Sequence, residues 1–175
     1  MKLYGRNFTK QELLKKVGDI SQIGDIKLTE MIDGQARGVR VAELNNASGI
    51  YMRILIDRGM DISDLRFNSV PLAWKSSVKE TSPAYYDKDG LEWLGTFYGG
   101  FMVTCGLTYA GAPCNDNGEE LGLHGRIANI AAENINIDNR WEGDNYILSI
   151  KGTVRQSKVF FENLVLKREI TVPID

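Results

Sequence analysis

The chain has 175 residues, of which 43% are hydrophobic and 25% are charged, and its formal net charge is −2. This composition is typical of a soluble globular domain with a sizeable core, and it lacks the basic stripe of a nucleic-acid-binding protein. Without a long apolar run or an apolar signal core, and with only two cysteines, the chain is expected in the cytoplasm, with reduced thiols and no membrane partner.

One short helix is expected near the amino terminus. Thr9 and Glu12 form a capping box, in which each side chain accepts a hydrogen bond from the backbone amide of the other residue. Gly18 is a suitable stop after about two to three turns. From residue 19 onward apolar and polar residues alternate, which predicts strands over 25–31, 39–44, 50–57, 60–67 and 70–74. The last strand is expected at a sheet edge because Pro71 has no amide to donate.

Residues 75–126 follow a different pattern. This segment is rich in glycine and holds seven of the sixteen aromatic residues, and only Phe101 to Leu107 has the character of a strand. Long irregular segments between strands are where binding surfaces usually form. The functional site is therefore expected in residues 75–126, which we call the insertion.

Strong alternation returns after residue 128, and it predicts strands over 134–139, 146–154 and 160–172, the first two joined by a hairpin at 142–145. Many strands separated by turn signals indicate a mainly β fold, a β-sandwich with one short N-terminal helix. The last strand would leave an open sheet edge, which proteins usually protect. Either a partner such as a second copy in a homodimer covers this edge, or residues 1–175 are the N-terminal portion of a longer domain rather than a single domain.

The stretch from Gly118 to Arg126 gathers polar groups around the only histidine. The neutral imidazole of His124 can donate a hydrogen bond to a sugar hydroxyl or ring oxygen, and it can accept one from a hydroxyl. The guanidinium of Arg126 can donate two hydrogen bonds to a pair of hydroxyls. Glu119 and Glu120 can hold hydroxyls, although a paired acid in a glycine-bounded loop is more often solvated. A histidine that caps a turn is an equally good interpretation of this spacing.

Three further residues are candidates for sugar binding. Arg58 at a strand junction can present its guanidinium to a cleft, with Asp61 orienting it, but a turn with a surface ion pair has the same pattern. Trp74 can stack on the apolar face of a sugar ring, although such residues more often pack in a core or a loop. The sequence has no phosphate loop, and its single histidine and two cysteines indicate no metal site and no cofactor.

Four motifs in order resemble the aldose 1-epimerase (galactose mutarotase-like) superfamily, and in particular a largely uncharacterised bacterial branch of it. They are RGMDIS at 58–63, VPLAW at 70–74, GGFMVTCGL at 99–107 and ELGLHGR at 120–126. The resemblance implies a β-supersandwich fold and the interconversion of the α and β anomers of a free sugar, without metal or redox cofactor. It identifies His124 as the histidine near the ring oxygen and Arg58 as an arginine that contacts the sugar.

The chain also departs from the family pattern. In the related His-Gly-x-x-Arg motif of sugar-phosphate mutarotases the arginine comes later after the histidine than it does here, so Arg126 can point elsewhere. Galactose enzymes have two glycines after the histidine, whereas only Gly125 follows His124 here. Family members are much longer, and their second histidine and glutamate base lie in the later half. This chain resembles the amino-terminal half only, and neither Glu119 nor Glu120 takes the place of that base.

The sequence thus predicts a carbohydrate-binding, aldose 1-epimerase-like isomerase that opens sugar rings by acid/base chemistry when complete. The alternatives are a non-catalytic carbohydrate-binding or sensing module and an inactive fragment. The expected partner is a small sugar, and no cluster of basic residues marks a phosphate pocket. The candidate residues are His124 for catalysis and Arg58, Arg126, Trp74, Asp61 and Glu120 for substrate binding.

Overall fold

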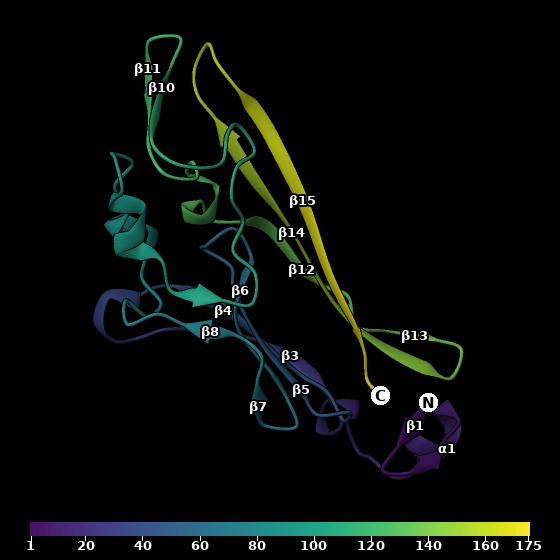
Figure 1. Cartoon of the computed structure of the whole chain (residues 1–175). Helices are drawn as coiled ribbons and strands as arrows, with labels where there is room; N and C mark the ends of the chain where they lie inside the picture. Colours follow the sequence, from purple (N-terminus) through teal and green to yellow (C-terminus); the bar gives the residue numbers. More distant parts are fainter.

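The computed structural model describes residues 1–175 and contains two antiparallel sheets that face each other across one core (Figure 1). The first sheet is a meander in the order β3-β4-β5-β6-β7, formed by Asp25–Glu30, Arg40–Asn45, Ile50–Leu55, Asp61–Phe67 and Val70–Pro71. The second sheet is built on β14, with β15 on one side and β12 and β13 on the other; these strands are Asn145–Ser157, Asn163–Pro173, Glu133–Ile137 and Arg140–Glu142. The mainly β sandwich predicted from the alternation is confirmed.

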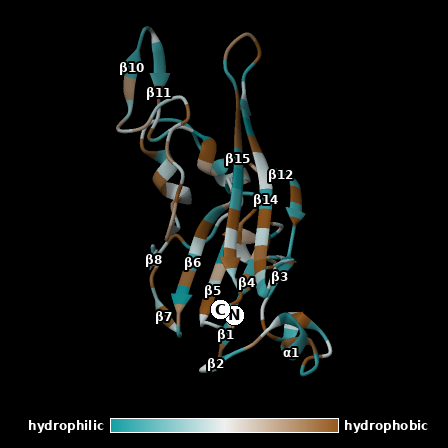
Figure 2. Ribbon diagram, turned by 90° about the vertical axis from the view of Figure 1, so that its right-hand side faces the viewer, coloured by the Kyte–Doolittle hydropathy of each residue, from teal (hydrophilic) through white to brown (hydrophobic).

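The core forms because one face of each sheet is apolar. Every second residue of β14 points inward, so Leu148, Ile150 and Val154 are fully buried against residues such as Leu44 and Ile54 of the first sheet. In Figure 2 hydrophobic residues recur along β14 between paler and hydrophilic ones. The paired sheets therefore bury a shared apolar layer, which is the main source of stability in a sandwich.

Gly152 interrupts the inward row of β14 for a steric reason. A Cβ atom at this position would overlap the sulfur of Met60, which comes from the turn before β6. The glycine therefore lets the methionine side chain lie flat against the strand and sets the local spacing of the two sheets.

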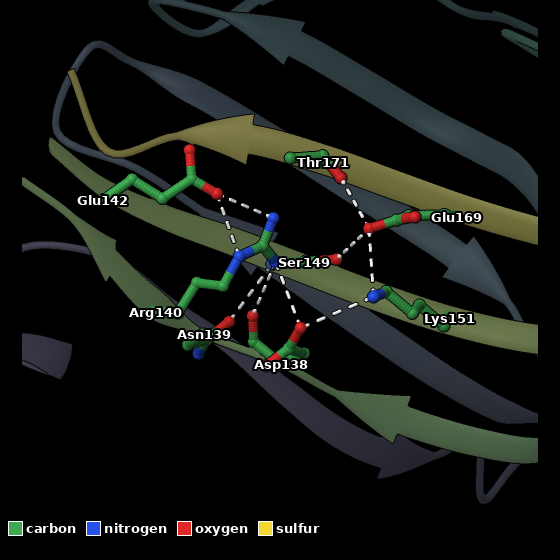
Figure 3. Close-up of polar contacts among 8 residues, drawn as sticks. All are labelled: Asp138, Asn139, Arg140, Glu142, Ser149, Lys151, Glu169 and Thr171. Atoms are coloured by element: carbon green, nitrogen blue, oxygen red, sulfur yellow. Dashed lines mark hydrogen bonds and ion pairs between the residues drawn. The ribbon is translucent and has the colours of Figure 1, made fainter.

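The outer face of the second sheet carries a polar network (Figure 3). Lys151 Nζ lies 3.4 Å from carboxylate oxygens of both Asp138 and Glu169, and Ser149 Oγ donates to Glu169 at 3.1 Å. Arg140 pairs with Asp138 at 3.1 Å. Because these charges are partly exposed, the pairs add little to stability, and their main effect is to keep this face polar.

The amino-terminal helix is present but shorter than predicted. Helix α1 covers Lys10–Leu14, and its capping box with Thr9 and Glu12 is complete, but the helix ends well before Gly18. Strands β1 (Lys2–Leu3) and β2 (Arg6–Asn7) precede it. The two chain ends lie side by side (Figure 1), and the amide of Lys2 donates to a carboxylate oxygen of Asp175 at 2.7 Å. No helix of the chain has the length and hydrophobicity needed to cross a bilayer.

The insertion is mostly irregular, as predicted, but the prediction of a strand over 101–107 is wrong. Only an isolated bridge between Met102 and Ile62 of β6 forms there. The amide of Thr104 donates to Asp61 instead of to a strand, so the pairing does not continue. The strand predicted over 70–74 is divided between β7 and β8. The short elements of the insertion are β8 (Trp74–Lys75), β9 (Gly99–Gly100), β10 (Cys114–Asp116), β11 (Glu119–Leu121) and 3₁₀ turns at Pro83–Tyr85 and Glu92–Thr96. Further 3₁₀ turns lie outside it, at Ile20–Gln22, Gly34–Ala36 and Ile127–Asn129.

The division of the 70–74 strand has a local cause. Strand β8 leaves the first sheet and pairs with β9, where Gly99 and Gly100 have φ values of +83° and +102°. A Cβ atom on Gly99 would overlap the carbonyl and ring of Trp74. Only glycines allow this close approach, and it fixes the position of the Trp74 ring.

Candidate functional site

The six candidate side chains do not converge on one cavity. Two line a pocket at the base of the insertion, two line a cleft between two hairpins, and two are buried beneath the surface. In that order they are Trp74 and His124, Glu120 and Arg126, and Arg58 and Asp61.

The first cavity, which we call the tryptophan pocket, has a volume of about 340 Å³. The Trp93 and Phe97 rings stack with their centroids 4.9 Å apart, and the Trp74 ring centroid lies 6.0 Å from that of Phe97. Trp74 is 64% exposed. The pocket thus offers flat aromatic surface to a ligand. It is lined by Trp74, Trp93, Leu94, Phe97, Gly99, Gly100, Val103, Cys105 and His124.

His124 is held by the backbone on both sides. It adopts a left-handed conformation with φ of +57°, its amide donates to Gly111 O, and its carbonyl accepts from Gly106 N, both at 3.0 Å. The amide of Gly111 also donates to His124 Nδ1 at 3.1 Å. A ring nitrogen that accepts a hydrogen bond carries no proton, so the neutral imidazole has its proton on Nε2. The Nε2–H group has no partner in the chain.

The aromatic and glycine neighbours fix the orientation of the histidine. Trp93 meets the imidazole edge-on, with ring centroids 5.0 Å apart. A Cβ atom at Gly122 would overlap the carbonyl oxygen of Lys88, so the chain passes closely beneath another loop just before His124. The glycine that precedes the histidine is therefore required by packing.

The second cavity, which we call the hairpin cleft, has a volume of about 510 Å³. It lies between the β10–β11 hairpin and the tip of the β14–β15 hairpin, which stand near each other in Figure 1. Lys158 Nζ donates to Glu119 Oε1 at 3.1 Å across the gap. The cleft is polar, and its lining comprises Tyr86, Lys88, Thr108, Tyr109, Glu119, Glu120, Leu121, Gly122, Arg126, Gln156, Lys158 and Glu162.

Arg58 is only 1% exposed and lines neither cavity. Its guanidinium donates to the carbonyls of Ala128 (2.7 Å), Thr81 (2.9 Å) and Thr96 (3.0 Å), and it lies 5.1 Å from the ring centroid of Tyr98. Burial lowers the pKa of this group, yet every donating nitrogen has a partner. The side chain joins three segments of the insertion and its border, and it is closed to a ligand in this structure.

Asp61 is fully buried and also binds the insertion. Its carboxylate accepts from the amide of Thr104 at 2.8 Å, from the Thr104 hydroxyl and from Arg168 Nη1 at 2.7 Å. Arg168 donates in addition to Gly59 O at 2.7 Å. These contacts hold the segment that leads to Cys105 at the wall of the tryptophan pocket.

Sequence reasoning missed Arg168 and Thr104. Arg168 occupies an inward position of β15, in the row of Leu164, Leu166, Ile170 and Val172. A charge in such an apolar row is a signal that a buried acid lies opposite, and this signal was available in the sequence. Thr104 carries no comparable signal. No group of three or more histidine, cysteine or acidic residues is placed to hold a metal ion.

Comparison with known proteins identifies one matching family and one similar crystal structure. The sequence pattern of the family described as "Domain of unknown function (DUF4432)" matches residues 36–175. The chain is also similar to a crystal structure described as a "putative aldose 1-epimerase from Klebsiella pneumoniae subsp. pneumoniae MGH 78578", with a TM-score of 0.78 and 24% identity. That similarity covers 94% of this chain and 42% of the other, so this chain spans less than half of the longer one. No curated protein matches the sequence. The fold expected from the four motifs is confirmed.

Proposed function

Because this chain belongs to the DUF4432 family, we propose that it is a carbohydrate-binding member with an aldose 1-epimerase-like fold, and that its sugar site is the tryptophan pocket. Its ligand would be a free aldose, met in the cytoplasm. A pocket of about 340 Å³ is in the size range of small-molecule sites.

The observation that carries this proposal is the state of His124. Its Nδ1 accepts from Gly111, which leaves Nε2–H as an unused donor in a pocket walled by Trp74 and Trp93. A sugar presents an apolar ring face for stacking and a ring oxygen that accepts hydrogen bonds. One fixed donor beside flat aromatic surface matches both properties.

The same donor suits anomer interconversion. In this reaction a base removes the proton from the anomeric hydroxyl, and the bond between C1 and the ring oxygen breaks as that oxygen gains a proton. Rotation about C1–C2 and ring closure then give either anomer. A hydrogen bond from His124 Nε2–H would stabilise negative charge that develops on the ring oxygen. Because Nδ1 already accepts from an amide, His124 is better suited to polarise this oxygen than to transfer its proton completely.

A second candidate function is sugar binding without turnover. The tryptophan pocket contains no carboxylate, and Asp61 is buried behind its wall. A general base for the anomeric hydroxyl would have to come from outside the residues that line this pocket. This favours a binding role for the 175 residues by themselves. Catalysis is favoured only where residues outside this pocket supply the base.

Two NMR measurements on the same sample test both functions. Titration with D-glucose, D-galactose and D-mannose should shift signals around His124, and exchange spectroscopy measures whether the two anomers interconvert faster than in buffer. Trp74→Ala and His124→Ala should weaken binding, whereas Tyr85→Ala, an exposed aromatic that lines neither cavity, should not. Binding with exchange supports an isomerase and binding without exchange supports the module. Absence of binding to all three sugars would overturn the proposal.

A further inference from the structure

The hairpin cleft is larger than the tryptophan pocket, and none of its lining residues belongs to that pocket. The segment from Gly122 to Arg126 runs between the two cavities, because its ends line the cleft while His124 lines the pocket. We propose that the hairpin cleft is a second binding site, for a neutral sugar or another uncharged polyhydroxylated ring. This inference does not depend on the function proposed for the tryptophan pocket.

The walls of the cleft are held in place by charged contacts. Arg126 Nη2 donates to the carbonyl of Ser157 at 2.6 Å and to Glu162 Oε1 at 3.1 Å. On the other side, Lys158 reaches Glu119 at 3.1 Å. Both contacts connect the tip of the β14–β15 hairpin to the insertion, so the cleft has a defined shape before any ligand arrives.

The charge balance of the cleft selects an uncharged ligand. Its lining has three basic residues and three acidic ones, and Lys158 and Arg126 each already face an acid. A phosphate or carboxylate ligand would have to displace these internal acids and would be repelled by them. Hydroxyl groups, in contrast, can accept from the free guanidinium and ammonium hydrogens and donate to the carboxylates.

The floor of the cleft holds a buried amide. Gln156 is 2% exposed, its Nε2 donates to Thr108 Oγ1 at 3.2 Å, and its Oε1 is closed to solvent and has no donor. Buried polar atoms without a partner are uncommon in folded proteins and call for a specific reason. A rotation of this amide toward the cleft would bring Oε1 to a ligand hydroxyl, which would supply the missing donor.

Two aromatic residues complete the match to a sugar. Tyr86 and Tyr109 line the cleft, and the Tyr86 hydroxyl donates to the carbonyl of Gly125 at 3.3 Å, which keeps this ring in place. Tyrosine rings provide an apolar surface for the C–H groups of a pyranose. Acceptors, donors and aromatic surface thus occur together around one cavity.

The experiment is an NMR titration of the ¹⁵N-labelled chain with D-glucose, D-galactose and D-mannose, each followed at the side-chain amide of Gln156 and the backbone amide of Gly122. Saturable shifts of both signals are expected with at least one of these sugars. Galactonate and glucosamine serve as the anionic and cationic probes, and inorganic phosphate serves as the simplest anion. Shifts with charged probes only, or with none of the three neutral sugars, would refute a neutral-sugar site.

Variants separate this site from the tryptophan pocket. Gln156→Leu keeps the side-chain size and should raise the Kd at the cleft roughly tenfold, since the ligand loses a buried partner. The exposed Gln11→Leu is the matched control and should leave the Kd unchanged. Trp74→Ala should abolish shifts around His124 while the Gln156 signal still responds. An unchanged Kd in Gln156→Leu would overturn the role of the amide, and if that variant does not fold, the Gln156 signal of the wild-type chain decides.

Discussion

Replacing Arg58 by methionine is predicted to destabilise the fold without acting directly on a ligand. Methionine fills a similar volume but donates no hydrogen bonds. The carbonyls of Thr81, Thr96 and Ala128 would then lose their side-chain donor in a region closed to water. These carbonyls belong to segments far apart in the sequence, so the change should loosen the whole insertion.

The magnitude follows from these contacts. Each buried carbonyl without a donor costs about 1–3 kcal/mol, which gives about 3–9 kcal/mol for three of them. Removing the guanidinium also removes the cost of burying a charge, which is several kcal/mol. Subtracting several kcal/mol from about 3–9 kcal/mol leaves a net loss of at most about 5 kcal/mol in the free energy of unfolding, with a middle value of about 2–4 kcal/mol. For a chain of this length, the middle value lowers Tm by about 4–16 °C.

Urea and thermal unfolding followed by circular dichroism provide the assay. Arg58→Lys keeps the charge but cannot reach three separate segments, so its loss should lie between that of methionine and wild type. The control is Arg6→Met at an exposed position, which should change stability by less than about 0.5 kcal/mol. If Arg58→Met unfolds like the wild type but no longer binds sugar, the side chain is a ligand group and the structural reasoning is wrong.

Three further predictions concern packing and pH. Gly122→Ala should abolish sugar shifts around His124 and lower Tm, because the new methyl group overlaps the Lys88 carbonyl, whereas Gly18→Ala, where a Cβ meets nothing, should change neither. Gly152→Val should cost more than about 2 kcal/mol in urea unfolding because it forces Met60 out of place, and the double variant with Met60→Ala should recover part of this loss. Burial raises the pKa of Asp64, but hydrogen bonds and charges from Arg66 and Lys75 outweigh it and lower the pKa overall. The stability from Asp64 is therefore present above its unfolded pKa and lost as pH falls through the folded value. Asp64→Asn should thus differ from wild type near pH 7 and converge with it only when the pH falls below the lowered pKa of the folded state.

The strands could be predicted because their pattern is local. In β14, alternation alone separates Leu148, Ile150 and Val154 from the polar residues between them. These three side chains are fully buried, whereas Lys151 and Thr153 are partly exposed. The capping box of α1 is equally local, since Thr9 and Glu12 lie within one turn. Such features need no knowledge of residues far away in the sequence.

The insertion and the candidate site could be predicted only in part. His124 and Trp74 do line one pocket, but the proton position of His124 depends on the amide of Gly111, which no sequence pattern indicates. Arg58 and Asp61 have the residue types of a binding site, yet their partners lie 23 to 107 positions away and enclose them. The motif therefore indicated that these charged side chains have a specific role. That they are buried could be seen only from the three-dimensional contacts.

The placement of the three tryptophans gives the protein an optical property. Trp74 and Trp93 border the tryptophan pocket, whereas Trp141 packs on Tyr146 with ring centroids 5.0 Å apart and lines neither large cavity. A ligand that covers the exposed Trp74 ring should exclude water from the indole and move its fluorescence emission to shorter wavelength. The hairpin cleft contains no tryptophan, so a ligand there should leave the emission spectrum nearly unchanged. Unlabelled protein in a fluorimeter can thus report which of its two cavities a given molecule enters.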